Sequence, residues 1–273
     1  MVTAENPLRT KQEVLDQRLR ELGSLLIAYS GGVDSAYLAW RAHEVLGDQM
    51  RAVLADSPSL PRRHFREALE FAQHHGIPVE IVRTAELENL DYARNDLNRC
   101  FHCKNELFRW MEMTRERLGQ RHLAYGMNLD DRADYRPGQK AALAHGVLAP
   151  LVEAGLTKAE IRELAREAGL DVWDKPAAPC LSSRVAYGQP VDAEVLRRIE
   201  ESEDYLWRIG LRHFRVRDHG DLARIEIARD EMPILLWPEA LDQVSARLKS
   251  IGFRYVTVDC SGFQSGSLNP QTI

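Results

Sequence analysis

The sequence predicts an α/β protein, with a doubly wound parallel sheet in a first domain and a smaller C-terminal α+β domain after it. Three observations support this prediction. Strand-like and helix-like segments alternate between residues 25 and 82, a glycine pair joins the first of these strands to its helix, and the pattern changes after residue 189. We therefore expect domains over 1–188 and 189–273, with Gly188-Gln189-Pro190 as the linker.

The first domain is predicted to hold short apolar strands of the kind that a buried parallel sheet contains. They are 25–29, 51–56, 78–82, 122–126 and 147–151. Helices are expected between and around them, in the segments 10–22, 36–46, 61–75, 86–122 and 157–168. Capping-box spacing marks the starts of two of these helices, at Thr10 and at Thr157.

The second domain is predicted to be a small α+β module. Its elements are a helix over 193–209, alternating strands over 213–217 and 223–227, a helix over 238–251 and a strand over 255–259. Cys260 continues the alternation of the last strand, so we expect it to be a buried small hydrophobe. Residues 264–273 are expected to form a loose tail.

The first strand leads directly into Ser30-Gly31-Gly32-Val33-Asp34-Ser35. Glycines let the backbone approach an anion, and the N–H groups of a helix's first turn have no partners of their own, so this segment predicts a phosphate site. The loop lacks the lysine of a Walker A motif. It resembles the pyrophosphatase loop (PP-loop) of enzymes that cleave ATP to AMP and pyrophosphate, and the alternative is a strand-to-helix turn without a ligand.

Ligands of a doubly wound sheet gather at the carboxyl ends of its strands. The residues that we expect to bind ATP lie in the loop and at neighbouring strand ends: Ala28, Ser30, Gly31, Gly32, Asp34, Ser35, Asp56 and Gly126. Asp130 and Asp131 follow the strand at 122–126 and are predicted to contact Mg²⁺ or ribose. The alternative for these two aspartates is a solvated turn.

Composition limits the possible partners. The chain carries a net charge of -5, which provides no basic footprint for nucleic acid. No apolar run approaches the roughly 20 residues that a membrane helix needs, and the N-terminus lacks the apolar core of a signal peptide. We therefore expect a cytoplasmic protein without a membrane or nucleic-acid partner.

The cysteines are Cys100, Cys103, Cys180 and Cys260. In a reducing compartment they do not form a disulfide framework, so each serves packing or chemistry. Cys180 lies on a constrained loop, because the prolines at 176 and 179 exclude a regular helix or a central strand. For the Cys-x-x-Cys pair the open roles are iron–sulfur ligation, zinc ligation, redox or persulfide chemistry, and inert packing.

The motifs together resemble the LarE family of ATP-dependent sulfur transferases, which build the nickel-pincer nucleotide cofactor of lactate racemase. The resemblance spans nearly the whole chain. Its motifs are the loop at 30–35, Asn98-Arg99-Cys100-Phe101-His102-Cys103-Lys104 and Pro179-Cys180-Leu181-Ser182-Ser183-Arg184, with further likeness at 215–220 and 265–269. The loop alone would indicate only the superfamily, which NAD, GMP and asparagine synthetases and tRNA thiolases share.

The resemblance implies a PP-loop fold of the adenine nucleotide alpha hydrolase type and a reaction on pyridinium-3,5-biscarboxylic acid mononucleotide. ATP and Mg²⁺ are implied as cofactors. ATP adenylylates a carboxylate, sulfur replaces oxygen, and a thiocarboxylate results. The family also implies a homo-oligomer, a hexamer, that assembles through the C-terminal module.

The resemblance suggests two sulfur sources. In the single-cysteine form of the family the cysteine that matches Cys180 attacks the activated acyl carbon and is consumed when its Cβ–S bond breaks. This chain departs from that form, since Cys100 and Cys103 add two thiols. Three thiolates suffice to hold a [4Fe–4S] cluster with one iron left without a protein ligand, so we favour ligation by Cys100, Cys103 and Cys180. Consumption of Cys180 is the alternative.

Basic side chains are expected to assist the catalytic cysteines. Arg184, Lys104 and Lys175 are candidates to activate the Cys180 thiolate or to hold phosphate. Guanidinium groups suit phosphate, and the family favours a substrate phosphate clamp made by Arg215 and Arg217, with Lys104 as a further candidate. A solvated strand face is the alternative for the two arginines. A metal site near the reactive thiol would draw on Glu200, Glu203 or Glu226.

Three other interpretations share part of this pattern. A tRNA thiolase would also use the ATP loop and three cysteines, but the acidic balance and the single Cys-x-x-Cys set are against it. An amide-forming ligase would not need Cys180. A nucleotide-binding module without enzymatic activity would not need the cysteine-bearing loop.

Overall fold

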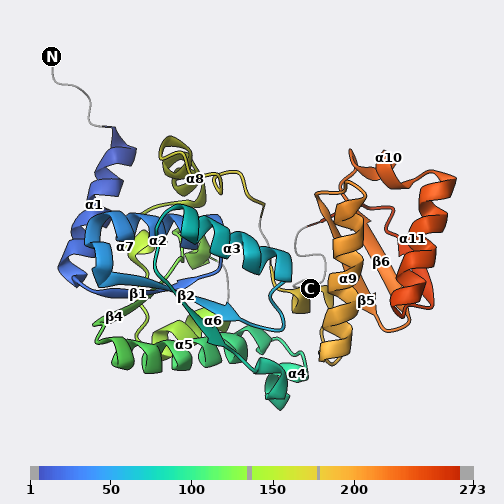
Figure 1. The fold of residues 1–273 in the computed structure, drawn as a ribbon, viewed down its shortest axis with the longest axis horizontal. Helices are drawn as coiled ribbons and strands as arrows, with labels where there is room; N and C mark the ends of the chain where they lie inside the picture. Colours follow the sequence, from blue (N-terminus) through green and yellow to red (C-terminus); the bar gives the residue numbers. More distant parts are fainter. Residues whose placement is uncertain (1–5, 134–136, 177–178, 265–273) are drawn as a thin grey trace. The chain divides into compact units, whose positions relative to one another are not determined.

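The computed structural model describes residues 6–133, 137–176 and 179–264. The chain divides into two compact units, each described by itself below (Figure 1). Unit 1 comprises residues 1–86 and 100–178, and unit 2 comprises residues 87–99 and 179–273. The linker expected at 188–190 therefore falls within the second stretch of unit 2, which begins at residue 179. The internal segment 87–99 belongs to the same unit.

Unit 1 is built on a four-stranded parallel sheet with the order β3-β2-β1-β4. The strands are β1 (Leu25–Tyr29), β2 (Met50–Asp56), β3 (Val79–Arg83) and β4 (His122–Tyr125). The first three strands follow one another outward, and the fourth pairs with the other side of β1. The predicted α/β class with a parallel sheet is confirmed. The strand order reverses between β1 and β4, which is where such sheets bind ligands.

The prediction of a fifth strand at 147–151 was wrong. Leu148 makes only a single parallel bridge with Ala124, in which its carbonyl accepts from the N–H of Tyr125 at 3.0 Å. Pro150 then opens the short helix α7 (Pro150–Glu153). Proline has no N–H to give to a ladder and its fixed φ suits a first helical position, so the pairing ends after one bridge.

Helices cover both faces of the sheet (Figure 1). Leu25, Ile27 and Tyr29 of β1 share a core with helices on one face, which are α1 (Pro7–Leu22), α2 (Val33–Leu46), α3 (Arg62–His74), α7 and α8 (Lys158–Glu167). Leu26 and Ala28 point the other way, into a core with α5 (Arg99–Leu118) and α6 (Pro137–Ala144). The alternation of strand side chains thus gives two cores. Short 3₁₀ turns span Gly47–Gln49, Glu86–Glu88 and Asp130–Ala133.

The first helix begins earlier than its capping-box spacing predicted. It starts at Pro7, and the Asn6 side chain accepts from the N–H of Leu8 at 3.1 Å. An N-cap asparagine followed by proline at the first helical position is a stronger start than the spacing at Thr10. The second predicted capping box is confirmed, since Thr157 and Glu160 make both of its hydrogen bonds.

Unit 2 contains a three-stranded sheet with the order β5-β6-β7. Its elements are α4 (Leu90–Ala93), a 3₁₀ turn (Leu181–Arg184), α9 (Ala193–Arg208), β5 (Phe214–His219), β6 (Leu222–Ile227), α10 (Met232–Leu235), α11 (Pro238–Ile251) and β7 (Tyr255–Val258). β5 and β6 form an antiparallel hairpin, and β7 pairs with β6 in parallel. The predicted sequence of two helices and three strands is confirmed, and α10 is an addition to it.

Cys260 is not buried in a strand. β7 ends at Val258, and Asp259 then accepts a side-chain hydrogen bond from the N–H of Ser261 at 2.8 Å, so the chain turns. Cys260 lies in this turn and is exposed. The predicted tail lies outside the described residues except for Gln264, as does the motif at 265–269.

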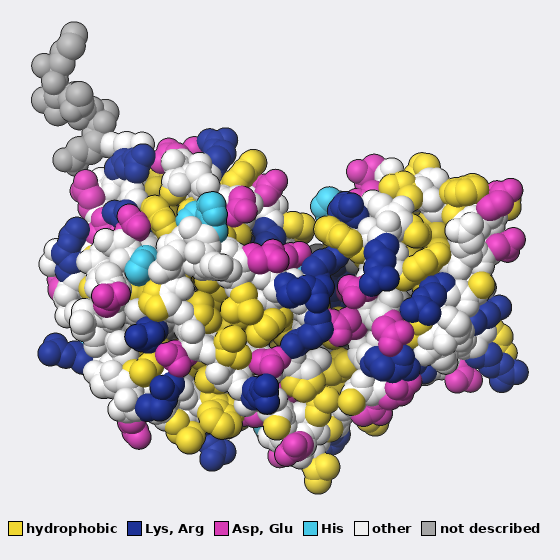
Figure 2. All heavy atoms as spheres, viewed as in Figure 1, with side chains coloured by type: hydrophobic (Ala, Val, Ile, Leu, Met, Phe, Trp, Pro, Cys, Tyr) yellow, Lys and Arg dark blue, Asp and Glu magenta, His cyan; other side chains and the backbone are white. Residues whose placement is uncertain are grey.

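Basic and acidic side chains stand beside one another on the visible face of each unit (Figure 2). In the part of the chain that the structure describes, no helix has both the length and the apolar composition needed to cross a membrane.

Candidate active site

The loop between β1 and α2 is shaped by its first glycine. Gly31 has a φ of +71°, and a Cβ built on it would lie 2.7 Å from the Cβ of Ala68 in α3. Both facts exclude a side chain at this position. Gly32 is the N-cap of α2 and has an ordinary extended φ of -79°, and a Cβ added to it would meet only the Ser30 hydroxyl, at 3.5 Å.

Hydroxyl groups hold the loop against the first turn of α2. Ser35 donates to the Gly32 carbonyl at 3.0 Å and accepts from the N–H of Ser30 at 3.2 Å. The Ser30 and Ser35 hydroxyl oxygens are 3.1 Å apart. Ser35 is buried whereas Ser30 is exposed, so the loop offers one hydroxyl and a helix N-terminus to solvent. That arrangement suits an anion.

The end of β4 lies against the same loop. A Cβ at Gly126 would come within 2.7 Å of the Ser35 nitrogen and 3.0 Å of the Asp34 carbonyl carbon. Only glycine allows this approach. The structure thus brings together the predicted ATP-binding residues Ala28, Ser30, Gly31, Gly32, Asp34, Ser35 and Gly126 at the carboxyl ends of β1 and β4.

Asp34 and Asp130 both contact Lys158, the first residue of α8. The Lys158 ammonium forms an ion pair with Asp34 Oδ2, and the Lys158 backbone N–H donates to Asp130 Oδ2 at 2.8 Å. Asp34 Oδ1 is buried and has no hydrogen-bond partner among the described residues. Asp131 accepts from the N–H of Asn128 at 3.3 Å. Sequence reasoning placed Lys158 only within a capping box and missed its contact with the loop.

The end of β2 forms a separate hollow of about 220 Å³. Asp56, predicted to bind ATP, lies in it as an ion pair with Arg62. Beside it, Ser57 and Ser59 both donate to Oε1 of Glu86, a carboxylate that is almost fully buried. The serines and the glutamate fix the loop after β2, and no periodicity or motif in the sequence marks them.

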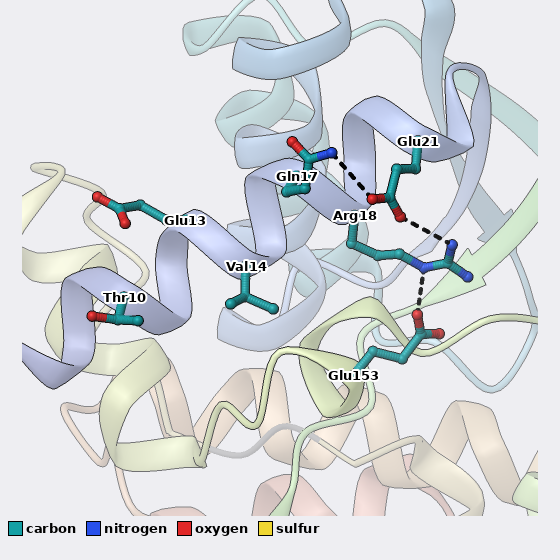
Figure 3. Close-up of a pocket in the computed structure, with 7 residues that line it drawn as sticks. All are labelled: Thr10, Glu13, Val14, Gln17, Arg18, Glu21 and Glu153. Atoms are coloured by element: carbon teal, nitrogen blue, oxygen red, sulfur yellow. Dashed lines mark hydrogen bonds and ion pairs between the residues drawn. The ribbon is translucent and has the colours of Figure 1, made fainter.

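A larger hollow is lined by residues of α1 and by Glu153, and none of the predicted site residues lines it (Figure 3). Arg18, one of the lining residues, forms ion pairs with Glu153 and Glu21 (Figure 3). These three side chains already form ion pairs with one another on an open surface, and we do not consider the hollow a candidate active site.

Cys100 and Cys103 lie in the first two turns of α5. Residues three positions apart share one helical face, so both thiols belong to the same side of the helix. Cys100 is exposed and Cys103 is half-buried. Lys104 follows them, and its side-chain stem packs on Gly138, where a Cβ would lie 3.0 Å from Lys104 Cγ.

In unit 2, Cys180 is the N-cap of the 3₁₀ turn 181–184. Its carbonyl accepts from the N–H of Ser183 and from the Arg184 guanidinium, both at 3.0 Å. Arg184 is only 1% exposed, and it also donates twice to Glu203 at 2.9 Å. Its guanidinium is therefore turned to the protein interior, which suits a residue that positions the cysteine turn.

The two arginines of the predicted phosphate clamp differ. Arg217 is buried, donates to Glu226 at 2.7 and 3.0 Å and donates to the Ser183 carbonyl at 2.9 Å. Arg215 is half-buried and lies over the Phe263 ring. Burial, with the nearby positive charge of Arg184, lowers the pKa of Arg215 to about 10. An anion bound there would relieve this unfavourable environment.

Residues of the internal segment 87–99 also form hydrogen bonds with the turn that Cys180 caps. Tyr92 and Ser182 hydroxyls are 2.6 Å apart, and the Arg99 guanidinium donates to the Ser182 carbonyl at 2.8 Å. Asn95, fully buried with a φ of 57°, donates to the carbonyls of Ala186 and Gln189 at 2.8 Å. Asparagine tolerates this left-handed conformation better than most residues.

Some of the side chains that were candidate metal ligands already form ion pairs with arginines. Among the residues that the structure describes, no three His, Cys, Asp or Glu side chains form a metal-binding group. Glu203 and Glu226 are engaged by Arg184, Arg217 and Arg224. The cysteine pair belongs to unit 1 and Cys180 to unit 2, so the predicted three-thiol set stays a prediction.

Two known proteins are similar to the chain over nearly its whole length, and others are similar to a shorter part. A protein of Synechocystis sp. (strain ATCC 27184 / PCC 6803 / Kazusa), described as uncharacterized, is 42% identical over 96% of the chain and 98% of that protein. The pyridinium-3,5-bisthiocarboxylic acid mononucleotide synthase of Lactiplantibacillus plantarum is 34% identical over 96% of the chain and 95% of that enzyme. A glutamine-hydrolysing GMP synthase of Brucella melitensis biotype 1 is 34% identical over 65 residues, 23% of the chain and 13% of that protein. No family model matches the chain.

Proposed function

Because the chain belongs to the family of the pyridinium-3,5-bisthiocarboxylic acid mononucleotide synthase, we propose that it is an ATP-dependent sulfur transferase acting on pyridinium-3,5-biscarboxylic acid mononucleotide. It would convert carboxylates of this substrate to thiocarboxylates, with release of AMP and pyrophosphate. The observation that carries the proposal is the similarity to that enzyme over nearly the full length of both chains. The glycine loop against β4 supports the ATP-dependent step.

The first step would activate the substrate. A carboxylate is a poor electrophile until its oxygen is joined to phosphorus, so ATP supplies AMP as the leaving group. The Ser30 hydroxyl and the N–H groups at the start of α2 would bind the phosphates. Mg²⁺ binds proteins through one or two carboxylates and takes its other ligands from phosphates and water. Asp34 Oδ1, which is buried and has no hydrogen-bond partner among the described residues, fits one such ligand, and Asp130 and Asp131 are further carboxylates at this edge.

The second step would deliver sulfur. As a thiolate, Cys180 attacks the acyl carbon and displaces AMP, and cleavage of its Cβ–S bond with loss of the α proton then leaves the sulfur on the substrate. The hydrogen bonds of Arg184 and Ser183 to the Cys180 carbonyl hold the turn in place for this attack. Cys180 is then consumed.

Alternatively, Cys100, Cys103 and Cys180 would ligate a [4Fe–4S] cluster, and the protein would survive many turnovers. When bound, such a cluster offers one iron without a protein ligand as a binding site for sulfide. Two observations support this route. Cys100 and Cys103 share a helical face, and Arg99, the residue before Cys100, is bonded to the turn that Cys180 caps.

The mononucleotide phosphate would bind at Arg215. The other predicted clamp residue, Arg217, is engaged by Glu226 and Ser183, so its proposed contribution is to hold the cysteine turn. Lys104 is half-buried beside the cysteine pair and is a further candidate for phosphate.

The test is to incubate protein purified without oxygen with MgATP and pyridinium-3,5-biscarboxylic acid mononucleotide, and to analyse the products by mass spectrometry. We expect thiocarboxylate, AMP and pyrophosphate. Thiolated tRNA or an amide, formed when tRNA or ammonia is supplied instead, would contradict the proposal and identify a thiolase or a ligase.

Iron and intact mass separate the two sulfur routes. A cluster predicts bound iron and sulfide that Cys100→Ser loses, whereas Cys260→Ser, which removes another exposed cysteine, leaves them unchanged. Consumption of Cys180 predicts instead a mass loss of about 34 Da, one hydrogen sulfide, after turnover.

We further propose that the protein is a cytoplasmic homo-oligomer. Apolar side chains exposed on α10, on α11 and on the two residues between these helices support association through unit 2; they are Ile234, Leu236, Trp237 and Leu241. Light scattering of the wild type and of Trp237→Glu would measure this, and a monomeric wild type would contradict it.

A further inference from the structure

Phe263 is an aromatic residue after β7 that neither the motifs nor the proposed function uses. We infer that Phe263 is a positioning residue for the substrate phosphate. Its ring orients the Arg215 guanidinium, so that the protein selects the phosphorylated mononucleotide over the nucleoside that lacks the phosphate. This inference rests on the proposed function, because it concerns the phosphate that Arg215 is proposed to bind.

The contact between the ring and the guanidinium is the first argument. Arg215 Cζ lies 5.1 Å from the centre of the Phe263 ring, and both residues belong to unit 2. The face of an aromatic ring carries negative charge density, so it attracts a cation at this distance. A guanidinium is planar, with its N–H donors in that plane. A ring that restricts where the plane lies therefore also restricts where the donors point.

Packing in a hydrophobic core does not account for this ring. Among the residues that the structure describes, the apolar side chains that form the core of unit 2 or pack against it do not include Phe263. Phe263 is nevertheless half-buried. Aromatic side chains usually contribute much of the apolar area that a core buries. A ring that lies outside the core and under a cation indicates a role toward that cation.

The backbone holds the ring in this place. The N–H of Phe263 donates to the carbonyl of Ile227, the last residue of β6, at 2.8 Å. Ile227 pairs with Phe214 across the β5–β6 hairpin, and Phe214 precedes Arg215. Gly262 has a φ of +78°, and a Cβ on it would lie 3.0 Å from the same Ile227 carbonyl oxygen. The turn thus requires glycine, and it fixes the residue that carries the ring.

The surroundings of Arg215 give the ring a purpose. Burial and the positive charge of Arg184 lower the pKa of Arg215 to about 10, and the Glu203 carboxylate acts in the opposite direction. The charged form of Arg215 is therefore held at a cost in free energy. A ring face stabilises a cation without neutralising it. An acidic residue at position 263 would instead repel the phosphate that the guanidinium is proposed to bind.

The expected effect is on binding rather than on the chemical step. A guanidinium that is already oriented loses less conformational freedom when the substrate binds. The phosphate of the mononucleotide is not the group that reacts with ATP, and no bond to it forms or breaks. Loss of the ring should therefore raise the KM for the mononucleotide and leave the maximal rate nearly unchanged.

The experiment compares two substrates on the full-length protein, the mononucleotide and the nucleoside that a phosphatase releases from it. We expect Phe263→Leu to raise the KM for the mononucleotide about tenfold, with the maximal rate of thiocarboxylate formation within about twofold of the wild type. The kinetics with the nucleoside should not change. The preference for the phosphorylated substrate, measured as the ratio of the two kcat/KM values, therefore falls about tenfold. Phe263→Trp keeps an aromatic face and should retain the preference.

Two comparisons separate positioning from a general structural role. Arg254 lies over the Tyr255 ring at 5.2 Å, at the start of β7. Tyr255→Leu removes this ring from the same unit and should leave the preference of the wild type unchanged. In an Arg215→Ala background, Phe263→Leu should raise the KM no further, because the ring acts through that arginine. Effects of the two substitutions that add would overturn the inference.

Urea unfolding identifies a variant that is destabilised. The preference is a ratio measured in one preparation, so it does not depend on the fraction of folded protein, and Phe263→Met replaces Phe263→Leu if the latter does not fold. The preference of the wild type in the folded variant without the ring overturns the inference, while the proposed function stands. A wild type that uses both substrates equally well overturns the phosphate site at Arg215 together with the inference. A wild type that forms no thiocarboxylate overturns the proposed function itself.

Discussion

Arg99 and Ser182, 83 positions apart in the chain, are joined by a hydrogen bond of 2.8 Å from the guanidinium to the carbonyl oxygen. One of these residues precedes Cys100 and the other follows Cys180 closely. Both are buried, so the bond forms where water does not compete. A hydrogen bond within unit 2 therefore joins residues that lie next to two of the predicted reactive cysteines.

The first prediction concerns this contact. Arg99→Lys keeps the charge but loses the planar guanidinium whose Nη1 donates to both Asn95 and Ser182. We expect a loss of roughly 2 kcal/mol in the free energy of unfolding and a fall of about tenfold in thiocarboxylate formation. Urea unfolding and product assays measure these. Arg94→Lys, whose side chain is exposed and pairs with Asp91, is the control and should change neither. Unchanged product formation by Arg99→Lys would speak against a role in positioning.

The second prediction compares two adjacent glycines. Gly31→Ala forces a side chain into a left-handed conformation and into Ala68, which we expect to cost roughly 3 kcal/mol in the free energy of unfolding. Gly32→Ala makes only an ordinary contact with the Ser30 hydroxyl and replaces a glycine N-cap with a less favourable alanine, so it should cost about 1 kcal/mol or less. Urea unfolding of the two variants side by side measures the difference. Equal stability would mean that the loop relaxes away from α3.

The third prediction concerns pH. Burial alone raises the pKa of Glu203, but the charge and hydrogen bonds of Arg184 outweigh it, so this pKa lies below its ordinary value of 4.5. The unfolded chain then binds the proton more readily. Stability from this pair is fully present above the ordinary pKa and is lost as the pH falls through the lower pKa of the folded state.

Glu203→Gln leaves Arg184 buried without its counter-charge. We expect a loss of roughly 3 kcal/mol at neutral pH and a flatter dependence of stability on pH in the acid range. Unfolding midpoints between about pH 3 and pH 7 measure both effects. Glu194→Gln removes an exposed partner of Arg197, whose contribution solvent screens, so it should change the acid slope much less than Glu203→Gln does. An identical acid slope in Glu203→Gln would refute the assignment.

The fourth prediction concerns the substrate phosphate. Arg215→Ala should raise the KM for the mononucleotide about tenfold or more, because a charge-assisted hydrogen bond to phosphate is lost. Pyrophosphate exchange at saturating mononucleotide should change little, since the glycine loop belongs to unit 1. Steady-state kinetics separate the two quantities. Arg247→Ala, on the exposed face of α11, serves as the control. A KM equal to that of the wild type would exclude Arg215 from the phosphate site.

Much of the fold could be predicted because local signals agreed with tertiary packing. The strand at 25–29 is apolar throughout and is buried throughout, and the capping box at Thr157 forms as its spacing indicates. The predictions of secondary structure failed where one or two residues changed the local backbone geometry. Pro150 turned a predicted strand into a helix, and Asn6 with Pro7 moved a helix start.

The site was predictable where chemistry is carried by consecutive residues, as in the loop at 30–35 and the Cys180 turn. It was not predictable where partners come from distant segments. Lys158 reaches Asp34 from 124 positions away, and Asn95 bonds carbonyls 91 and 94 positions ahead. Periodicity and motif spacing contain no information on such pairs. Glu86 is another example, because only the fold brings it to two serines.

The segment 87–99 has a consequence for how the protein can be made. The two stretches of unit 2, 87–99 and 179–273, lie on either side of residues 100–178 of unit 1, so no single cut releases unit 2 intact. During synthesis, Asn95 leaves the ribosome well before Ala186 and Gln189, whose carbonyls accept hydrogen bonds from its side chain. Until Ala186 and Gln189 are synthesised, the Asn95 side-chain amide lacks the two carbonyl partners that it has in the folded protein. A fusion that joins only residues 179–273 to another domain would leave out residues 87–99, and the carbonyls of Ala186 and Gln189 would lose Asn95 as a donor.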